Sequence, residues 1–356
     1  MELIGKQHYV LPEGKIYLNW AASCPALADA SAFFEYRKMK SLNREKNAYY
    51  DFLDDEVRRL AGRLFQCDPS RVFIASNATS ALLDVLDRWL LGHPNSTIIK
   101  TRQSYPSLVL AGNGVQTHWV QATDAGYLEA IAACSGAGMV LIEGCDYLSG
   151  RRYDINAIQV AAARKGLSVI LDASQWPAPN LHSQENMAII FAGHKWAGGP
   201  NGIAIGIIPK SFPLDGRSGT ESLTRGWRLP LESFSFKETA ARLDAGGGGN
   251  PYLNLALLHQ SLSLLASVGR EAVEDHIVQL AGTLRAKLSQ LNVQLLPTNL
   301  ASMVCFQIPF ADFGNAAEDH GLILTSGLGR VRLSPAPFNS EKDIDDAVAI
   351  IGRMIE

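Results

Sequence analysis

Uninterrupted apolar runs recur through the first 210 residues and constrain the fold more than any other feature of the sequence. They are RVFIAS (71–76), STIIKT (96–101), MVLIEG (139–144), LSVILDA (167–173), MAIIFAG (187–193) and GIAIGII (202–208). A strand that is apolar at successive positions, rather than at alternate ones, is buried on both faces. Amphipathic stretches between the runs predict helices at 80–91, 105–112 and 155–166. Strands that alternate with helices in this way are typical of a mainly parallel α/β sheet.

The second part of the chain has a different character. Residues 211–250 mix arginines, aromatics and turn residues and end in the glycine-rich LDAGGGGNPY (243–252). Long irregular connections inside a compact domain are often functional. Beyond them we expect helices over 251–290, a short β-rich part with VQLLP and SMVCFQIP, and a last amphipathic helix, EKDIDDAVAIIGRMIE.

Length and charge limit the class of protein. A chain of 356 residues is long enough for a large domain and a smaller one. The net charge is −3, from 32 basic and 35 acidic residues, without a basic stripe, so we expect no nucleic-acid partner. No apolar run approaches the roughly 18 residues that span a membrane. The start, MELIGKQHYV, lacks a signal-peptide pattern, so a cytoplasmic location is expected.

The cysteines point away from disulfides and metal. They are scattered singly and form no CxxC pair, which argues against a disulfide framework or a structural zinc site. We expect each to be a small buried hydrophobe, and we expect no metal site. The five are Cys24, Cys67, Cys134, Cys145 and Cys305.

Polar side chains follow the predicted strands, at the edge where ligands bind in open α/β sheets. A desolvated lysine there loses its proton more easily and becomes a nucleophilic amine. A carboxylate can hold a proton on a pyridine nitrogen, and a helix N-terminus can hold a phosphate. Together these groups indicate a pyridoxal phosphate (PLP) site. The strand-end segments are Asn77–Ser80, Arg102–Tyr105, Cys145–Tyr147, Asp172–Gln175 and Gly193–Lys195.

Motifs along nearly the whole chain carry a family resemblance. They are IYLNWAAS (16–23), SNATSALL (76–83), SYPS (104–107), CDYLSGRRYDI (145–155), LDASQ (171–175), GHKWAGGPNG (193–202) and VRLSPAPFNSEKDID (331–345). In this order they resemble the class V aminotransferase and cysteine desulfurase group of fold-type I PLP enzymes, which also includes kynureninase. The segment at 145–155 is most similar to the kynureninase branch.

The resemblance implies a fold and a division of the chain. We expect a fold-type I α/β protein with a mainly parallel seven-stranded sheet in a large PLP-binding domain, and a smaller α+β domain. The large domain is predicted at 15–250, and the small one at 1–14 plus 251–356. A homodimer with its active site at the interface is the family expectation.

The resemblance also assigns roles around the cofactor. Lys195 matches the Schiff-base lysine, and Asp172 matches the acid that pairs with the pyridine nitrogen. Gln175 matches the side chain near the phenolic oxygen, although it could be a solvated loop residue. Tyr105 matches the ring against the cofactor face, although an aromatic is more often plain core.

Phosphate and substrate residues follow from the same resemblance. Ala78 and Thr79 match the phosphate loop, with simple helix capping by Asn77 or Thr79 as the alternative. His194 matches a phosphate-binding residue, with a structural histidine as the alternative. Arg332 matches the arginine that binds the substrate α-carboxylate, for which a guanidinium fork is suited; Arg330, two residues away, is the fallback.

Further residues are assigned with an open alternative. Asn19, Trp20 and Ala21 match the N-terminal segment that closes over the substrate, although Trp20 could be ordinary packing. Arg225 and Arg228 could reach an acidic substrate or could be solvated loop residues.

The sequence also departs from the family pattern. Desulfurases carry a nucleophilic cysteine shortly before the carboxylate arginine, but HGLILTSGLGRVRLS contains none. Relatives often have a serine where this chain has Ala192. A Gly-Thr-Pro-Asn loop of many relatives is replaced by Gly246–Asn250 and Pro251, which suits either phosphate contact through backbone N–H groups or a flexible linker.

The predicted function is a PLP-dependent enzyme that acts on a small amino acid through an external aldimine and Cα deprotonation. An aminotransferase-type reaction is favoured, and a cysteine desulfurase is not expected. The alternatives are a β-eliminating carbon–sulfur lyase or a kynureninase-like lyase. A non-catalytic PLP-fold binding subunit is the alternative from another class.

Overall fold

The computed structural model describes residues 2–175, 185–214, 240, 243–244, 250–296, 302–308 and 312–355. The glycine run at 246–249 and the predicted loop residues Arg225 and Arg228 lie outside the described residues.

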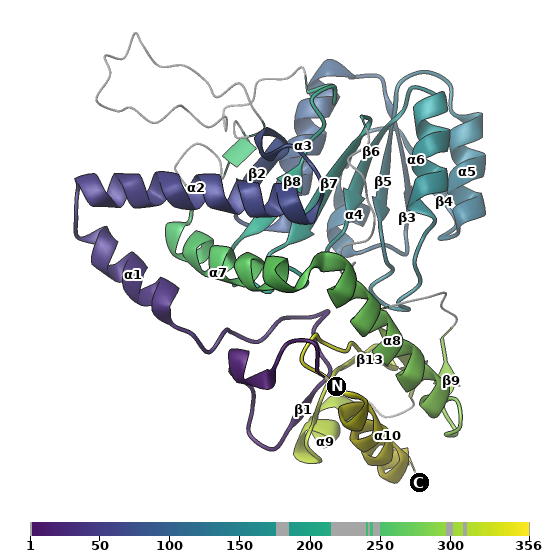
Figure 1. Ribbon diagram of the computed structural model, residues 1–356. Coiled ribbons are helices and arrows are strands. Elements are labelled where there is room, and N and C mark those ends of the chain that lie inside the picture. The colour runs from purple at the N-terminus through teal and green to yellow at the C-terminus, as the bar shows by residue number, and fades with distance from the viewer. Residues whose placement is uncertain are drawn as a thin grey trace.

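A seven-stranded sheet forms the centre of the larger part, in the order β2-β8-β7-β6-β5-β3-β4 (Figure 1). Every neighbouring pair that does not include β8 is parallel, so the expected mainly parallel sheet is confirmed. The strands are β2 (Val72–Ala75), β3 (Thr97–Thr101), β4 (Thr117–Val120), β5 (Gly138–Glu143), β6 (Ser168–Asp172), β7 (Met187–Ala192) and β8 (Ala204–Ile207).

Helices cover both faces of this sheet, which explains the uninterrupted apolar strands. Along β5, Val140 and Ile142 pack with the helices of one layer, whereas Met139 and Leu141 pack with those of the other. Because each strand alternates its side chains between the two faces, burial of both faces requires an apolar residue at every position. The first layer contains α2 (Arg44–Leu64), α5 (Asp124–Ala133), α6 (Ile155–Arg164) and α7 (Tyr252–Val268), and the second contains α3 (Ala78–Gly92) and α4 (Pro106–Leu110).

A smaller α+β part has its own hydrophobic core. Its four-stranded sheet has the order β12-β13-β10-β9 and is antiparallel throughout. The strands are β9 (Gln294–Leu295), β10 (Val304–Gln307), β12 (Thr325–Gly327) and β13 (Arg330–Leu333). The helices are α8 (Arg270–Leu288), α9 (Phe313–Asp319) and α10 (Glu341–Ile355).

Short elements complete the chain. They are the 3-10 turns η1 (Lys6–His8) and η2 (Pro69–Arg71), the helix α1 (Ser31–Lys40), and the strands β1 (Ile16–Tyr17) and β11 (Leu322–Ile323).

Two sets of contacts cross the boundaries between the two expected domains. The boundaries themselves stay a prediction. The strand β1 pairs in parallel with β11, so residues 16–17 are tied to the smaller part. The helix α7 lies beside α2 (Figure 1) and buries Leu255 and Leu258 in the core beneath the large sheet.

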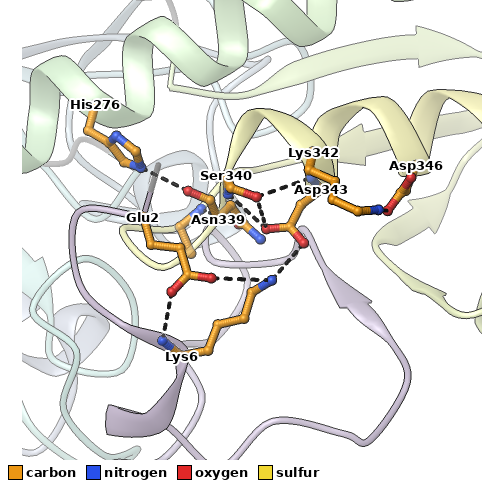
Figure 2. Close-up of polar contacts among 9 residues, drawn as sticks. Glu2, Lys6, His276, Asn339, Ser340, Lys342, Asp343 and Asp346 are labelled. Carbon is orange, nitrogen blue, oxygen red and sulfur yellow. Dashed lines mark hydrogen bonds and ion pairs between the residues drawn. The ribbon is translucent and has the colours of Figure 1, made fainter.

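A polar cluster fastens the N-terminal segment to α10 (Figure 2). Lys6 Nζ lies 2.7 Å from a carboxylate oxygen of Asp343. Asp343 also accepts the backbone N–H of Ser340 at 2.7 Å, and the Ser340 hydroxyl accepts the N–H of Asp343 at 3.3 Å. This reciprocal pair is a capping box that satisfies two N–H groups at the start of α10. His276 of α8 joins the cluster through the carbonyl of Asn339, 3.0 Å from its Nε2.

Replacing Asp343 should make the free energy of unfolding change less between neutral and acid pH. Burial raises the pKa of Asp343, but hydrogen bonds from Lys6 and Ser340 outweigh it and lower the pKa overall. A carboxyl with a lowered folded-state pKa stabilises the protein above its unfolded pKa of about 3.9, and loses this effect as pH falls through the folded value. We expect Asp343→Ala to cost about 1–2 kcal/mol at pH 7 in urea unfolding, and clearly less near pH 2. An equal cost at both pH values would contradict this assignment, and the exposed Asp346→Ala serves as the control.

Replacing Asp244 should destabilise the protein strongly. Its carboxylate accepts the backbone N–H of Ile74 in β2 at 2.9 Å and binds the buried guanidinium of Arg58 in α2. Removing one partner leaves the other charge buried without compensation. We expect Asp244→Ala to lower the free energy of unfolding by about 3 kcal/mol or more. A loss no larger than that of Asp346→Ala would show that the pair is dispensable.

Candidate active site

A cavity of about 530 Å³ opens at the carboxyl ends of the parallel strands. Its wall is formed by residues that follow β2, β3, β5, β6 and β7, together with the hairpin of β12 and β13. The strand ends meet at this edge because the parallel register aligns them, with Glu143 of β5 opposite Asp172 of β6. The predicted rim therefore exists as one hollow.

Lys195 lies on a tight turn directly after β7. The turn closes through the N–H of Gly199, which donates to the carbonyl of Gly193 at 2.8 Å. A side chain at Gly193 would approach the carbonyl oxygen of Ile203 to 2.8 Å, so this position requires glycine. The ammonium nitrogen of Lys195 lies 5.5 Å from the ring centre of Tyr105. The turn thus points the lysine into the cavity.

Burial prepares the Lys195 amine for chemistry. Desolvation lowers its pKa; the nearby Asp172 carboxylate opposes this shift, and the Arg332 guanidinium adds to it. A lysine with a lowered pKa loses its proton more readily and can act as a nucleophile or a base.

Asp172 ends β6 and is held in place by the neighbouring strand. Its Oδ1 accepts the backbone N–H of Ser174 at 2.8 Å. The Ser174 hydroxyl in turn accepts the N–H of Ala192, the last residue of β7, at 3.1 Å. This connection fixes the carboxylate relative to the turn that carries Lys195.

The N-terminus of α3 supplies an anion site on the same wall. Asn77 caps the helix, and its side chain accepts the N–H of Ser80 at 2.8 Å. Ala78 and Thr79, the first helical residues, line the cavity. Free N–H groups and the helix dipole favour a phosphate at this position.

Arg332 approaches from the smaller part of the molecule. It donates from Nη1 to the carbonyl of Tyr147 at 2.9 Å and from Nη2 to the Thr325 hydroxyl at 3.4 Å. Arg330 lies on the same face of β13 and also lines the cavity. The smaller part therefore presents guanidinium groups to a cavity whose lysine comes from the large sheet.

The other predicted cofactor residues also line the cavity. Tyr105, Gln175 and His194 do so, and the ring of Tyr105 meets that of Tyr147 edge-to-face at 5.2 Å. Burial lowers the pKa of His194, and the charge of Lys195 lowers it further, so this imidazole is neutral near pH 7.

Two predicted substrate residues, Asn19 and Trp20, are not among the residues that line the cavity, and their role in substrate binding stays a prediction. Trp20 is a core residue with 1% exposure, packed 5.8 Å from the ring of Tyr9 and 5.7 Å from that of Phe338. Asn19 instead accepts a hydrogen bond from the Thr325 hydroxyl. Ala21 of the same segment does line the cavity. The segment passes the cavity at Ala21, but the side chain of Trp20 points into the core, where it packs against Tyr9 and Phe338.

Three buried polar atoms on residues of the cavity wall have no hydrogen-bond partner among the described residues. They are Glu143 Oε1, Gln175 Oε1 and Arg332 Nε. Buried polar groups without partners are costly, so these atoms indicate a polar ligand. Of these three residues, the sequence did not single out Glu143, although an acid at the end of an apolar run is the signal that identified Asp172.

The described residues show neither a membrane-spanning helix nor a cluster of metal ligands. Within the described ranges no helix is both long and apolar enough to cross a bilayer. In the same part of the chain, no three His, Cys, Asp or Glu residues gather in a way that could hold a metal ion.

Comparison with known proteins shows broad similarity. The family model "Aminotransferase class-V" matches residues 37–344. The fold is similar to the apo cysteine desulfurase of Thermococcus onnurineus NA1, at 18% identity and TM-score 0.81, covering 98% of this chain and 97% of that one. It is also similar to the cystine C–S lyase C-DES in complex with its product cysteine persulfide, at 19% identity and TM-score 0.79, covering 96% and 98%.

A further structure, a C-DES mutant with glycine covalently linked to its PLP cofactor, matches at 18% identity and TM-score 0.82, covering 98% of this chain and 99% of that one. Among curated proteins, none matches this chain significantly.

Removing the charge of Asp172 should lower the pKa of Lys195 further. The carboxylate stabilises the ammonium form, so Asp172→Asn leaves the amine easier to deprotonate. We expect the pH profile for labelling of Lys195 by trinitrobenzenesulfonate, followed by mass spectrometry, to move to lower pH. The exposed Asp346→Asn should leave the profile unchanged. A shift to higher pH would show that Asp172 does not act on this lysine.

Proposed function

Because the chain belongs to the class V aminotransferase family, we propose that it is a PLP-dependent enzyme that acts on a small amino acid. The observation that carries this proposal is the convergence of Lys195, Asp172 and Arg332 on one cavity. A desolvated amine, a carboxylate and a guanidinium are the groups that such an enzyme needs for its cofactor and for an α-carboxylate.

The residues present fit PLP. The N-terminus of α3, at Ala78 and Thr79, would hold the phosphate, and Asp172 would pair with the pyridine nitrogen. Tyr105, Gln175 and His194 would complete the cofactor's surroundings. When bound, PLP supplies an aldehyde that joins covalently to amines and a ring that accepts electrons.

The protein's own groups then divide the work on the substrate. Arg332 binds the α-carboxylate, using donors such as its unpartnered Nε. The neutral amine of Lys195 takes the proton from the substrate Cα and returns one, as a general base and acid. Positioning of Cα between Arg332 and Lys195 reduces the entropic cost of this step.

We favour an aminotransferase-type outcome, with β-elimination as the second candidate. In the first reaction the donor amino acid leaves as a 2-oxo acid and its amine passes to an acceptor 2-oxo acid. In the second reaction a β-substituent leaves the substrate and no acceptor is needed. Similarity to the cystine C–S lyase C-DES favours the second candidate. A kynureninase-like cleavage rests on the motif at 145–155 alone.

We further propose that the protein is not a cysteine desulfurase. None of the five cysteines, all within the described residues, lines the cavity. The thiolate is the reactive form of cysteine, and burial raises the pKa of Cys305 to about 12. Cys305 also lies inside β10, opposite Arg332 in the neighbouring strand, rather than on a loop.

A cytoplasmic homodimer remains part of the proposal. The family expectation supports the homodimer, and sedimentation at several concentrations would test the assembly.

Amine transfer should depend on both an acceptor and Lys195. We expect the PLP-loaded protein to transfer amine from a small amino acid to a 2-oxo acid, and Lys195→Ala to lose at least about 10³-fold in rate. The measurement is product formation across a panel of amino acids, with and without the acceptor. Ammonia released in step with substrate loss without an acceptor would replace transamination by β-elimination. If borohydride reduction leaves no PLP attached to Lys195, the non-catalytic alternative stands.

A further inference from the structure

Glu143 is the cavity residue for which the proposed reaction has no role. It is the last residue of β5, which lies between β6 and β3 in the sheet. The ends of those two neighbours lead to Asp172 and Tyr105, so Glu143 lies on the wall between two residues that would hold the cofactor.

The side chain is buried and incompletely satisfied. Glu143 is only 3% exposed, and its Oε1 has no hydrogen-bond partner among the described residues. An ionised carboxylate in this position would carry both a desolvation cost and an unsatisfied oxygen. The position therefore suits a carboxylic acid that keeps its proton.

The surrounding charges act in the same direction. Burial raises the pKa of Glu143 well above its ordinary value, and the carboxylates of Asp146 and Asp172 raise it further. Hydrogen bonds to this carboxyl from the Tyr105 backbone and the Ser104 side chain lower the pKa, but by less. The adjacent Tyr127 and Tyr153 bring no charge, because burial also raises the pKa of both phenols.

One cation also lies close to Glu143. Lys195 is near enough for a charge on Glu143 to raise the lysine pKa. Burial lowers the pKa of Lys195. A lysine that is less often protonated stabilises an ionised Glu143 less. Of the two carboxyl groups on the described cavity wall, Asp172 and Glu143, the second is the one with an unpartnered buried oxygen.

We propose that Glu143 is a neutral carboxylic acid that donates its proton in a hydrogen bond to the bound PLP. The proposal rests on the proposed function, because PLP is the acceptor. If this is right, a neutral amide at position 143 should support PLP binding as well as Glu143 does, whereas a side chain without a hydrogen-bond donor should not.

The test compares wild type, Glu143→Gln and Glu143→Ala, with the exposed Glu318→Gln as the matched control. The first measurement is the affinity of each apo-protein for PLP in an absorbance titration. The second is the pH midpoint of the visible band of PLP bound to Lys195. Thermal unfolding of each variant checks that it folds.

We expect Glu143→Gln to keep the wild-type affinity and pH midpoint, and Glu143→Ala to bind PLP about five- to tenfold more weakly. If Glu143 were ionised, Glu143→Gln would remove a negative charge near Lys195 and lower the midpoint, by about one pH unit for a close charge. That shift would overturn the proposal, as would wild-type affinity in Glu143→Ala.

Two results separate this proposal from the one it rests on. Failure of wild type to attach PLP at Lys195 would overturn the proposed function and the role of Glu143 together. Normal attachment in wild type with no difference among the variants would overturn the role of Glu143 alone. If Glu143→Ala does not fold, the pH midpoint of Glu143→Gln still decides.

Discussion

The register of the central strands is the constraint on which the site depends. Glu143 pairs with Asp172, and Asp172 with Ile190, in a sheet that is buried on both faces. A slip of one residue would exchange the two faces of a strand and move Asp172 from the cavity into a helix layer. The apolar layers prevent such a slip, since every residue of β5, β6 and β7 is buried. The packing of the core therefore fixes the distance between the acid and the lysine turn.

Desolvation then gives these groups different protonation states. The same loss of water that lowers the pKa of Lys195 raises that of Glu143, because burial disfavours the charged form of either group. The result is a cavity whose wall combines a reactive amine, a retained acid and the carboxylate of Asp172. The unpartnered oxygen of Gln175 adds a further buried polar atom to this wall.

The elements with a strong local pattern could be predicted from sequence, and those defined by distant contacts could not. The buried strands and α3 follow from apolar runs and helical spacing. The helix α2 has few apolar residues, and only their spacing at Leu53, Val57, Leu60 and Leu64 marks its buried face. The pairing of β1 with β11 joins segments about 300 residues apart, which no local pattern records. Lys195 follows an apolar run, and Asp172 and Glu143 both end one, but only Lys195 and Asp172 also match the motifs of the family resemblance. The inward turn of Trp20 depends on Tyr9 and on Phe338, and Phe338 is far from Trp20 in sequence.

The hydrogen bond between Asn19 and Thr325 has a consequence for how the molecule tolerates change. Thr325 also receives a hydrogen bond from Arg332, so the orientation of this arginine is set in part by the first twenty residues of the chain. The N-terminal segment therefore supports the wall of the cavity as well as the fold. A change in this segment would therefore reach both the guanidinium of Arg332 and the core of the large sheet, to which Tyr9 and Trp20 belong.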